Sequence, residues 1–157
     1  MADIVIIDHS SEVLRELERK ITAALTACGE QAKSYASQNV VAAGRVDTHT
    51  LEGGMESEVK GDTCYVGTNV EYAGYHEFGT GIYAGGSGYW VYVPGGGGGG
   101  SGKRYSEEKA RQVVAILRSK GLDAHMTQGV KGIHFLKNAI ANHISEYTNI
   151  IKEYLKR

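Results

Sequence analysis

The chain has 157 residues, of which 41% are hydrophobic and 22% are charged, and its formal net charge is −1. These values are ordinary for a globular protein, and the length suffices for one domain with its own core. The N-terminal apolar run Ile4–Ile7 lies between Asp3 and Asp8 and is too short for a secretory signal or a membrane span. We therefore expect a protein made in the cytosol that has no membrane partner.

Glycine content and charge distribution depart from the average. There are 22 Gly against one Pro, and 17 of the Gly lie between Gly53 and Gly102. Residues 1–102 carry 6 Lys and Arg against 13 Asp and Glu, a balance of −7, whereas residues 103–157 carry 11 against 5, a balance of +6. Opposite signs suit a contact within the chain or head-to-tail between copies, although a solvated helix with spare lysines gives the same counts.

Apolar residues recur at steps of three and four between Val13 and Tyr35, which predicts a long amphipathic helix with one buried face. The stripe consists of Leu14, Leu17, Ile21, Leu25, Cys28, Ala32 and Tyr35. We expect Ser10 or Ser11 to cap the start of this helix. Gly29 costs ~1 kcal/mol relative to Ala inside a helix, so it marks a bend or a close approach of another segment.

The segment MESEVKGDTCYVGT, residues 55–68, predicts a β-hairpin. If Gly61 and Asp62 form a two-residue turn, alternate residues fall on the same side of the ribbon. The drier side then carries Met55, Ser57, Val59, Cys64, Val66 and Thr68. A third strand-like run extends from Tyr89 to Val93, and Pro94 ends it.

The tract Gly95–Gly102 has almost no side chains to bury and behaves as a flexible connector. It fits a loop that orders against a neighbouring molecule, a spacer, or an engineered linker. Two helices follow it. Ser106 caps the first, Glu107–Lys120, which has acidic residues at its start, basic residues at its end and Gly121 as its stop.

The last helix is expected to begin near Gly132 and to be long and amphipathic. Its stripe is Leu136, Ile140, His143, Ile144, Tyr147, Ile151, Tyr154 and Leu155. Long helices at both ends of a group of strands indicate an α+β fold. We predict one domain over residues 1–157, in which these helices cover a small antiparallel sheet and the short helix is an insertion.

Residues typical of catalysis or of ligand binding are scattered through the sequence. The six consecutive Gly lack the strand-to-helix setting and the Lys-Ser/Thr ending of a phosphate loop, and the six His form no HExxH motif. His76-Glu77 has no nucleophile elbow nearby, and Cys28 and Cys64 lack metal-knuckle spacing and fit small buried hydrophobes. We expect no enzyme activity and no catalytic, metal or cofactor site.

The segment VGTNVEYAGYHEFGTG, from Val66 to Gly81, sets three aromatic residues among small and flexible ones. Together with the second motif TQGVKGIHFLKNAI and the order of the elements, it resembles the small head-to-tail joining proteins of long-tailed phages, which complete the neck and tail. The resemblance covers most of the chain. It is carried by Asn69, Tyr72, Ala73, Tyr75, Glu77, Gly79, Thr80 and Gly81 in the first motif and by Gly132, Phe135, Leu136 and Ala139 in the second.

Two stretches stand apart from the common pattern of that family. The segment EEKARQVVAILRSKGLDAH looks like an elaboration found in a subset of the family. Where relatives tend to have a Thr-Gly-x-Leu turn followed by Ser, this chain reads THTLEGG from Thr48 to Gly54.

The resemblance implies a structural virion protein, made in the cytoplasm of the bacterial host. Its copies would form a ring, a hexamer by analogy with tail symmetry, that contacts neighbouring neck proteins, the tail terminator or the tail tube. DNA would at most pass through the lumen. The tail type, and whether the particle is a phage or a DNA-free tail-like particle, stay open. The alternative function is nucleic-acid binding by the basic C-terminal third.

Aromatic side chains with few torsions suit a surface that is wet before assembly and buried after it, and the glycines allow close backbone approach. The candidate subunit interface comprises Tyr72, Tyr75, Glu77, Phe78, Thr80, Trp90 and Tyr92. The competing interpretation is that Tyr72, Tyr75 and Phe78 pack a turn of helix onto the chain's own sheet.

Overall fold

The computed structural model describes residues 8–44, 49–94 and 103–156. The fold mixes helices with two small antiparallel sheets, as the α+β prediction requires. By its internal contacts the chain divides into two compact units, residues 1–70 with 135–157 and residues 71–134, called unit 1 and unit 2 below. The single-domain assignment stays a prediction, and the tract Gly95–Gly102 lies outside the described residues.

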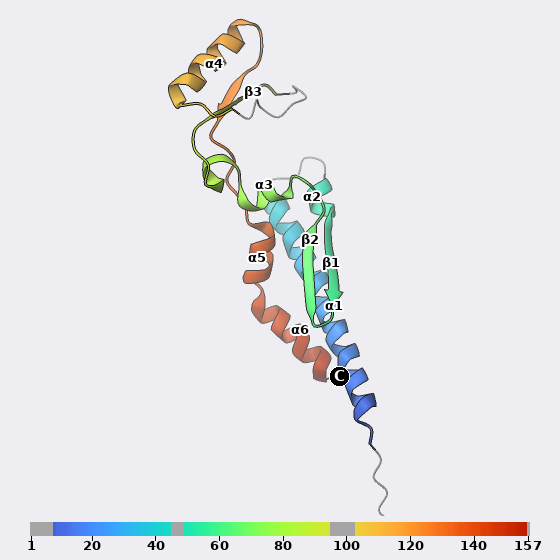
Figure 1. Ribbon diagram of the computed structural model, residues 1–157. Coiled ribbons are helices and arrows are strands. Elements are labelled where there is room, and N and C mark those ends of the chain that lie inside the picture. The colour runs from blue at the N-terminus through green and yellow to red at the C-terminus, as the bar shows by residue number, and fades with distance from the viewer. Residues whose placement is uncertain (1–7, 45–48, 95–102, 157) are drawn as a thin grey trace, which may run out of the picture. The chain divides into compact units, whose positions relative to one another are not determined.

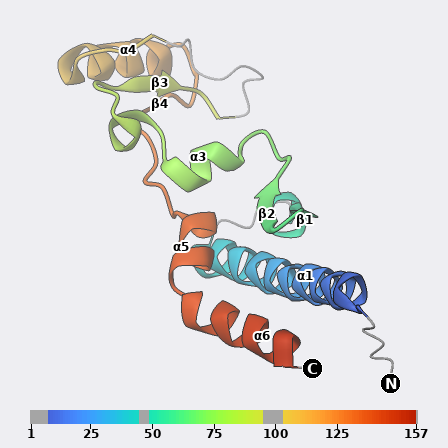
Figure 2. The ribbon, with the colours of Figure 1, turned by 60° about the horizontal axis from the view of Figure 1, so that its bottom comes forward.

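Unit 1 is built on the helix α1 (Ser10–Ala42). The hairpin of β1 (Met55–Lys60) and β2 (Thr63–Thr68) packs on one side of α1. The helices α5 (Phe135–Ala141) and α6 (Ile144–Lys156) pack on another (Figures 1 and 2). The short helix α2 (Thr50–Gly53) precedes the hairpin and inserts the buried Leu51.

The buried face of α1 is made of small residues rather than the long ones of the predicted stripe. Its buried positions are Ala24, Gly29, Ala32, Ala36 and Val40. A Cβ on Gly29 would lie 2.7 Å from Cys64 Sγ, which confirms the predicted close approach at this glycine. Leu14 and Leu17 are exposed, and Ile21, Leu25, Cys28 and Tyr35 are half-buried, so the stripe is only partly covered in a single chain.

The hairpin has the predicted register, with Val59 opposite Cys64, Ser57 opposite Val66 and Met55 opposite Thr68. Gly61 has φ of +61°, which the tight two-residue turn requires. The side that carries Met55 faces α1, and the opposite side, with Glu56 and Glu58, is exposed.

Unit 2 contains α3 (Ala73–Phe78), the 3₁₀ turn η1 (Gly81–Ala84), β3 (Trp90–Tyr92), α4 (Glu107–Ser119) and β4 (His125–Thr127). The helix α4 packs on the β3–β4 ribbon around a small core of Val91, Ala110, Val114 and Ala124. Ser106 Oγ accepts a hydrogen bond from the Lys109 amide, so the predicted cap is confirmed.

Three local expectations need correction. The helix α1 starts with Asp8 Oδ1 accepting from the Ser10 amide, at 2.8 Å, and not with a serine cap. The last helix begins at Phe135 rather than near Gly132, and it is interrupted between α5 and α6. The strand within Tyr89–Val93 pairs with β4 in a sheet of its own and does not extend the hairpin.

Truncation of Phe135 tests the core of unit 1. Phe135 is fully buried, and its carbonyl accepts from Asn39 Nδ2 of α1 at 3.0 Å. We expect Phe135→Ala to lower the free energy of unfolding by about 3–5 kcal/mol, because it removes a buried ring and leaves a cavity. Urea unfolding followed by circular dichroism measures the change.

Two matched truncations calibrate this result. Ile144 is 62% exposed, so Ile144→Ala should stay within about 0.5 kcal/mol of the parent. Ile21→Ala should fall between the two, because Ile21 is half-buried and not, as its place in the stripe suggests, at the centre of the core. A loss for Phe135→Ala no larger than that for Ile144→Ala would contradict the assignment of the core.

Candidate subunit interface

Two glycine-containing segments of unit 2, residues 76–82 and 128–134, lie backbone against backbone. A Cβ on Gly81 would lie 1.8 Å from the Gln128 carbonyl oxygen, and one on Gly132 would lie 2.6 Å from the Glu77 carbonyl oxygen. Gly79 and Gly81 also have φ of +81° and +64°, which favours glycine. Gly79 and Gly81 of the first motif and Gly132 of the second are therefore required by the same contact.

Main-chain hydrogen bonds join the two segments along their length. The amides of Thr80 and Ile82 donate to the carbonyl oxygens of Val130 and Gln128, at 2.8 and 2.9 Å. The amide of Ile133 donates to the His76 carbonyl oxygen at 2.8 Å. In addition, the Val130 amide donates to Thr80 Oγ1 at 2.9 Å, which gives the hydroxyl of this candidate residue a structural role. We call this pairing the glycine crossing.

The aromatic side chains of α3 and of the turn after it are exposed on unit 2. Tyr75 and Phe78 have relative exposures of 65% and 66%, and Tyr72 has 38%. Ile82 and Tyr83 add exposed apolar surface from η1. We call these five residues the aromatic ridge. Within the described part of unit 2, Tyr75 and Phe78 are therefore not core residues, while Tyr72 packs its ring edge-on against His76, with centroids 5.7 Å apart.

The remaining candidate residues differ in their surroundings. Glu77 is buried, with 6% exposure, so its carboxylate is not part of the surface. Trp90 is half-buried and packs beside Gly81, where a Cβ would come within 2.7 Å of its ring. The Arg104 guanidinium lies over the same ring, 5.9 Å from its centroid. Tyr92 is 41% exposed and lies beside His125. The assignment of the seven residues to an interface stays a prediction.

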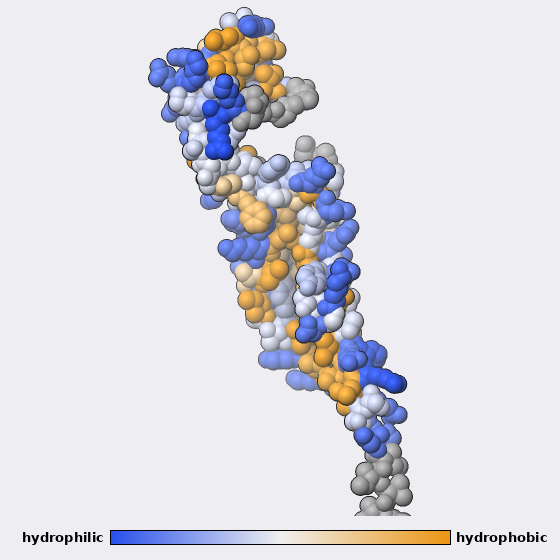
Figure 3. All heavy atoms as spheres, in the orientation of Figure 1, coloured by the Kyte–Doolittle hydropathy of each residue, from blue (hydrophilic) through white to orange (hydrophobic). Residues whose placement is uncertain are grey.

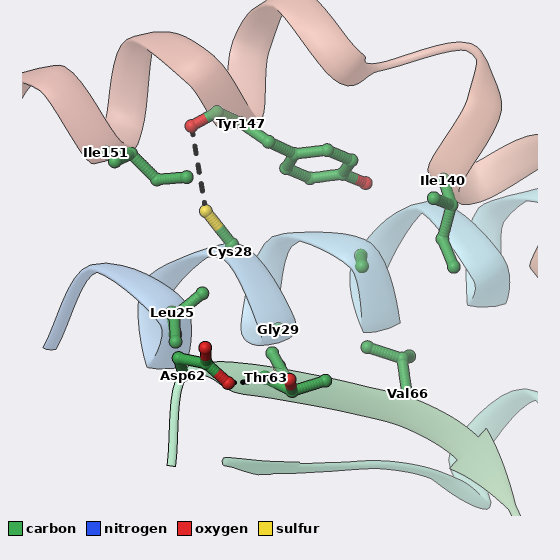
Figure 4. Close-up of a pocket in the computed structure, with 11 residues that line it drawn as sticks. Leu25, Cys28, Gly29, Asp62, Thr63, Val66, Ile140, Tyr147 and Ile151 are labelled. Atoms are coloured by element: carbon green, nitrogen blue, oxygen red, sulfur yellow. Dashed lines mark hydrogen bonds between the residues drawn. The ribbon is translucent and has the colours of Figure 1, made fainter. Parts of the chain in front are cut away.

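Unit 1 carries a second candidate surface that the sequence reading missed. An apolar groove of about 300 Å³ runs over α1 between β2 and the α5–α6 pair (Figure 4). Its lining consists of Leu25, Cys28, Gly29, Ala32, Asp62, Thr63, Cys64, Val66, Ile140, Tyr147 and Ile151. Apolar surface gathers in this part of unit 1 in the space-filling view (Figure 3). The small residues of α1 are the only signal of the groove in the sequence, because the walls of the groove come from three segments that are far apart along the chain.

Both cysteines line this groove as free thiols, half-buried rather than fully buried as expected. Burial raises the pKa of each thiol, with a smaller contribution from Cys64 at Cys28 and from Glu30 at Cys64. Cys28 Sγ donates to the Tyr147 carbonyl oxygen at 3.7 Å (Figure 4). At neutral pH the thiols are therefore protonated and contribute to an apolar lining.

A polar cluster closes one end of the α1–α6 contact. The rings of Tyr35 and His143 stack with centroids 3.5 Å apart, and the Tyr35 hydroxyl donates a hydrogen bond to the Glu146 carboxylate. The hydrogen bond from Tyr35, together with His143, lowers the pKa of the Glu146 carboxyl. His143 thus serves the contact between two helices, which is one of the structural roles open to a histidine on an apolar stripe.

Metal-ligand clusters and membrane-spanning helices were sought among the described residues. No three His, Cys, Asp or Glu side chains in that part of the chain gather closely enough to hold a metal ion. None of its helices combines the length and the apolar character needed to cross a bilayer. Comparison with protein-family models, with curated proteins and with solved structures found no match. The resemblance to phage neck proteins therefore stays a hypothesis.

The glycine crossing can be tested at Gly81, with Gly74 as a matched control. Gly81→Ala places a methyl group against the Gln128 carbonyl and strains a positive φ, so we expect a loss of at least about 2 kcal/mol in unfolding free energy. Chemical unfolding followed by the fluorescence of Trp90, the sole tryptophan and a neighbour of Gly81, measures it.

Gly74 lies in α3 with no atom near its added Cβ. Gly74→Ala should therefore be neutral or stabilising by up to about 1 kcal/mol, because alanine favours a helix. An equal loss in both variants would show that the crossing does not demand glycine at position 81.

Proposed function

We propose that this chain is a structural virion protein whose copies form a ring, a hexamer by analogy with tail symmetry, in the neck of a tailed phage or tail-like particle. The ring joins or completes the tail at its head-proximal end and contacts neighbouring neck proteins, the tail terminator or the tail tube. The protein is made in the host cytoplasm and resides in the virion. DNA at most passes through the lumen.

The observation that carries the proposal is the aromatic ridge. Large aromatic side chains exposed as a group are typical of surfaces that become buried in an assembly. Tyr75 and Phe78 project from a short helix whose position is held by the main-chain bonds of the glycine crossing. A preorganised ridge loses little conformational entropy on docking, which favours affinity.

The alternative of nucleic-acid binding receives less support from the fold. The basic C-terminal third is divided between the two units, since Lys137, Lys152 and Lys156 belong to unit 1 and the Lys and Arg of residues 103–131 belong to unit 2. Arg111 is paired with Glu107 at 2.6 Å. Binding to duplex DNA with a steep salt dependence would favour the alternative over the ring.

Tyr75→Ala tests the proposed function directly. We expect the variant to stay folded, because Tyr75 is 65% exposed, and to assemble less well than the parent. Sedimentation and electron microscopy of the purified protein measure ring formation, and incorporation into tail particles measures function. Lys152→Ala in α6 is the control and should assemble more readily than Tyr75→Ala, since exposed charges contribute little affinity.

Two results would count against the proposal in different ways. If Tyr75→Ala enters particles normally, the aromatic ridge is not in the interface. If the parent protein is absent from purified tail particles and its micrographs contain no rings, the chain is not a neck protein of this kind.

A further inference from the structure

The amphipathic helix α6, which forms part of the groove wall in unit 1, is not fully covered by the rest of the chain. Tyr147 and Ile151 of α6 line the groove, yet no residue of α6 is buried in the single chain. Ile140 of α5, at the groove wall, is 49% exposed, and Ile151 is only half-buried. A volume of about 300 Å³ lies at the lower end of pockets that hold small ligands, and it can admit an aromatic side chain.

The chain itself carries a matching projection. The aromatic ridge of unit 2 exposes Tyr75 and Phe78 by about two-thirds each, while the groove of unit 1 lacks apolar cover. Two different surfaces on one chain that complement each other generate a head-to-tail contact, and repetition of that contact closes a ring if the rotation between copies allows it.

Charge complements this pairing. Unit 1 carries 13 Asp and Glu against 10 Lys and Arg, and unit 2 carries 5 against 7, so their balances are −3 and +2. Asp62 lies at the groove with no cation paired to it among the described residues, and its carboxylate accepts only from Thr63 there. The backbone of Lys131 pairs with that of Gly79, the residue that follows Phe78. The Lys131 side chain has no carboxylate partner in the described part of the chain.

We infer that the groove over α1 is a docking site for the aromatic ridge of a second copy of this chain, with Phe78 entering between β2 and the α5–α6 pair. The inference rests on the proposed function, because it names the contact that joins neighbours in the ring. It assigns opposite roles to the two units: unit 2 supplies the projecting part and unit 1 the receiving part.

The groove cysteines make a direct test possible. A Phe78→Cys variant places a thiol on the ridge, within reach of Cys64 or Cys28 once the ridge is docked. Oxidation by dissolved oxygen, which accepts the two electrons of each disulfide, should give disulfide-linked dimers and higher oligomers on non-reducing gels. The pH is mildly alkaline because the raised pKa of the groove thiols keeps them protonated at neutral pH. Peptide mapping should join position 78 to a groove cysteine.

The control for nonspecific oxidation is Ile116→Cys, on α4, whose parent residue is 54% exposed and lies on neither surface. Mixing chains labelled with different nitrogen isotopes distinguishes links between copies from links within one chain. Links confined to one chain, or equal yields in Phe78→Cys and Ile116→Cys, would overturn the inference.

A second pair of variants tests the groove wall. Ile140→Glu, introduced into the Phe78→Cys chain, should reduce the cross-linked yield about tenfold or more, because it puts a charge into an apolar docking site. Val41→Glu, on α1 outside the groove, is the matched control, since Val41 is 47% exposed and Ile140 is 49% exposed. Circular dichroism checks that both variants fold. Equal yields in the two variants would contradict docking in the groove.

The two hypotheses can fail separately. Rings or particles that contain the protein but give no link between position 78 and the groove would remove the docking inference and leave the proposed function standing. A link between copies in the purified protein, combined with its absence from tail particles, would remove the function and leave the docking contact.

Discussion

The structure of unit 2 depends on one contact between two stretches of its backbone. Where residues 76–82 meet residues 128–134, main-chain atoms occupy the space that side chains would otherwise fill, and the amides of Thr80 and Ile82 are satisfied across the contact. The chain can then expose Tyr75 and Phe78 from a helix of only six residues, which alone would be too short to hold its shape. The aromatic ridge thus depends on the glycines.

Local sequence signals predicted the parts of the fold that local physics determines. The alternation of residues 55–68 and the Gly61-Asp62 turn fix the hairpin register, and Ser106 fixes the start of α4. The partner of β3 could not be predicted, because β4 has only three residues and lies 33 positions after Tyr92. The groove of unit 1 could not be predicted from the sequence either, because its walls come together only when α1, β2 and α6 pack against one another.

The periodicity of α1 identified apolar positions but not how they are covered. Small residues such as Ala32 and Ala36 allow the hairpin and α5–α6 to pack closely against the helix, so these positions are buried while Leu14 and Leu17 remain exposed. An amphipathic pattern predicts which face of a helix becomes buried, but it does not predict whether the same chain or another one covers that face. In a protein that assembles, both kinds of cover produce the same spacing.

Folding also changes what the charge pattern means. The contrast of −7 and +6 between the two parts of the sequence becomes −3 and +2 between the two units, because the C-terminal helices return to unit 1. Charges of this size, on exposed side chains and in physiological salt, can orient an encounter but contribute little to affinity. The exposed rings and the apolar groove would then provide most of the binding free energy, and pairs such as Asp62 with Lys131 would select the register in which they meet.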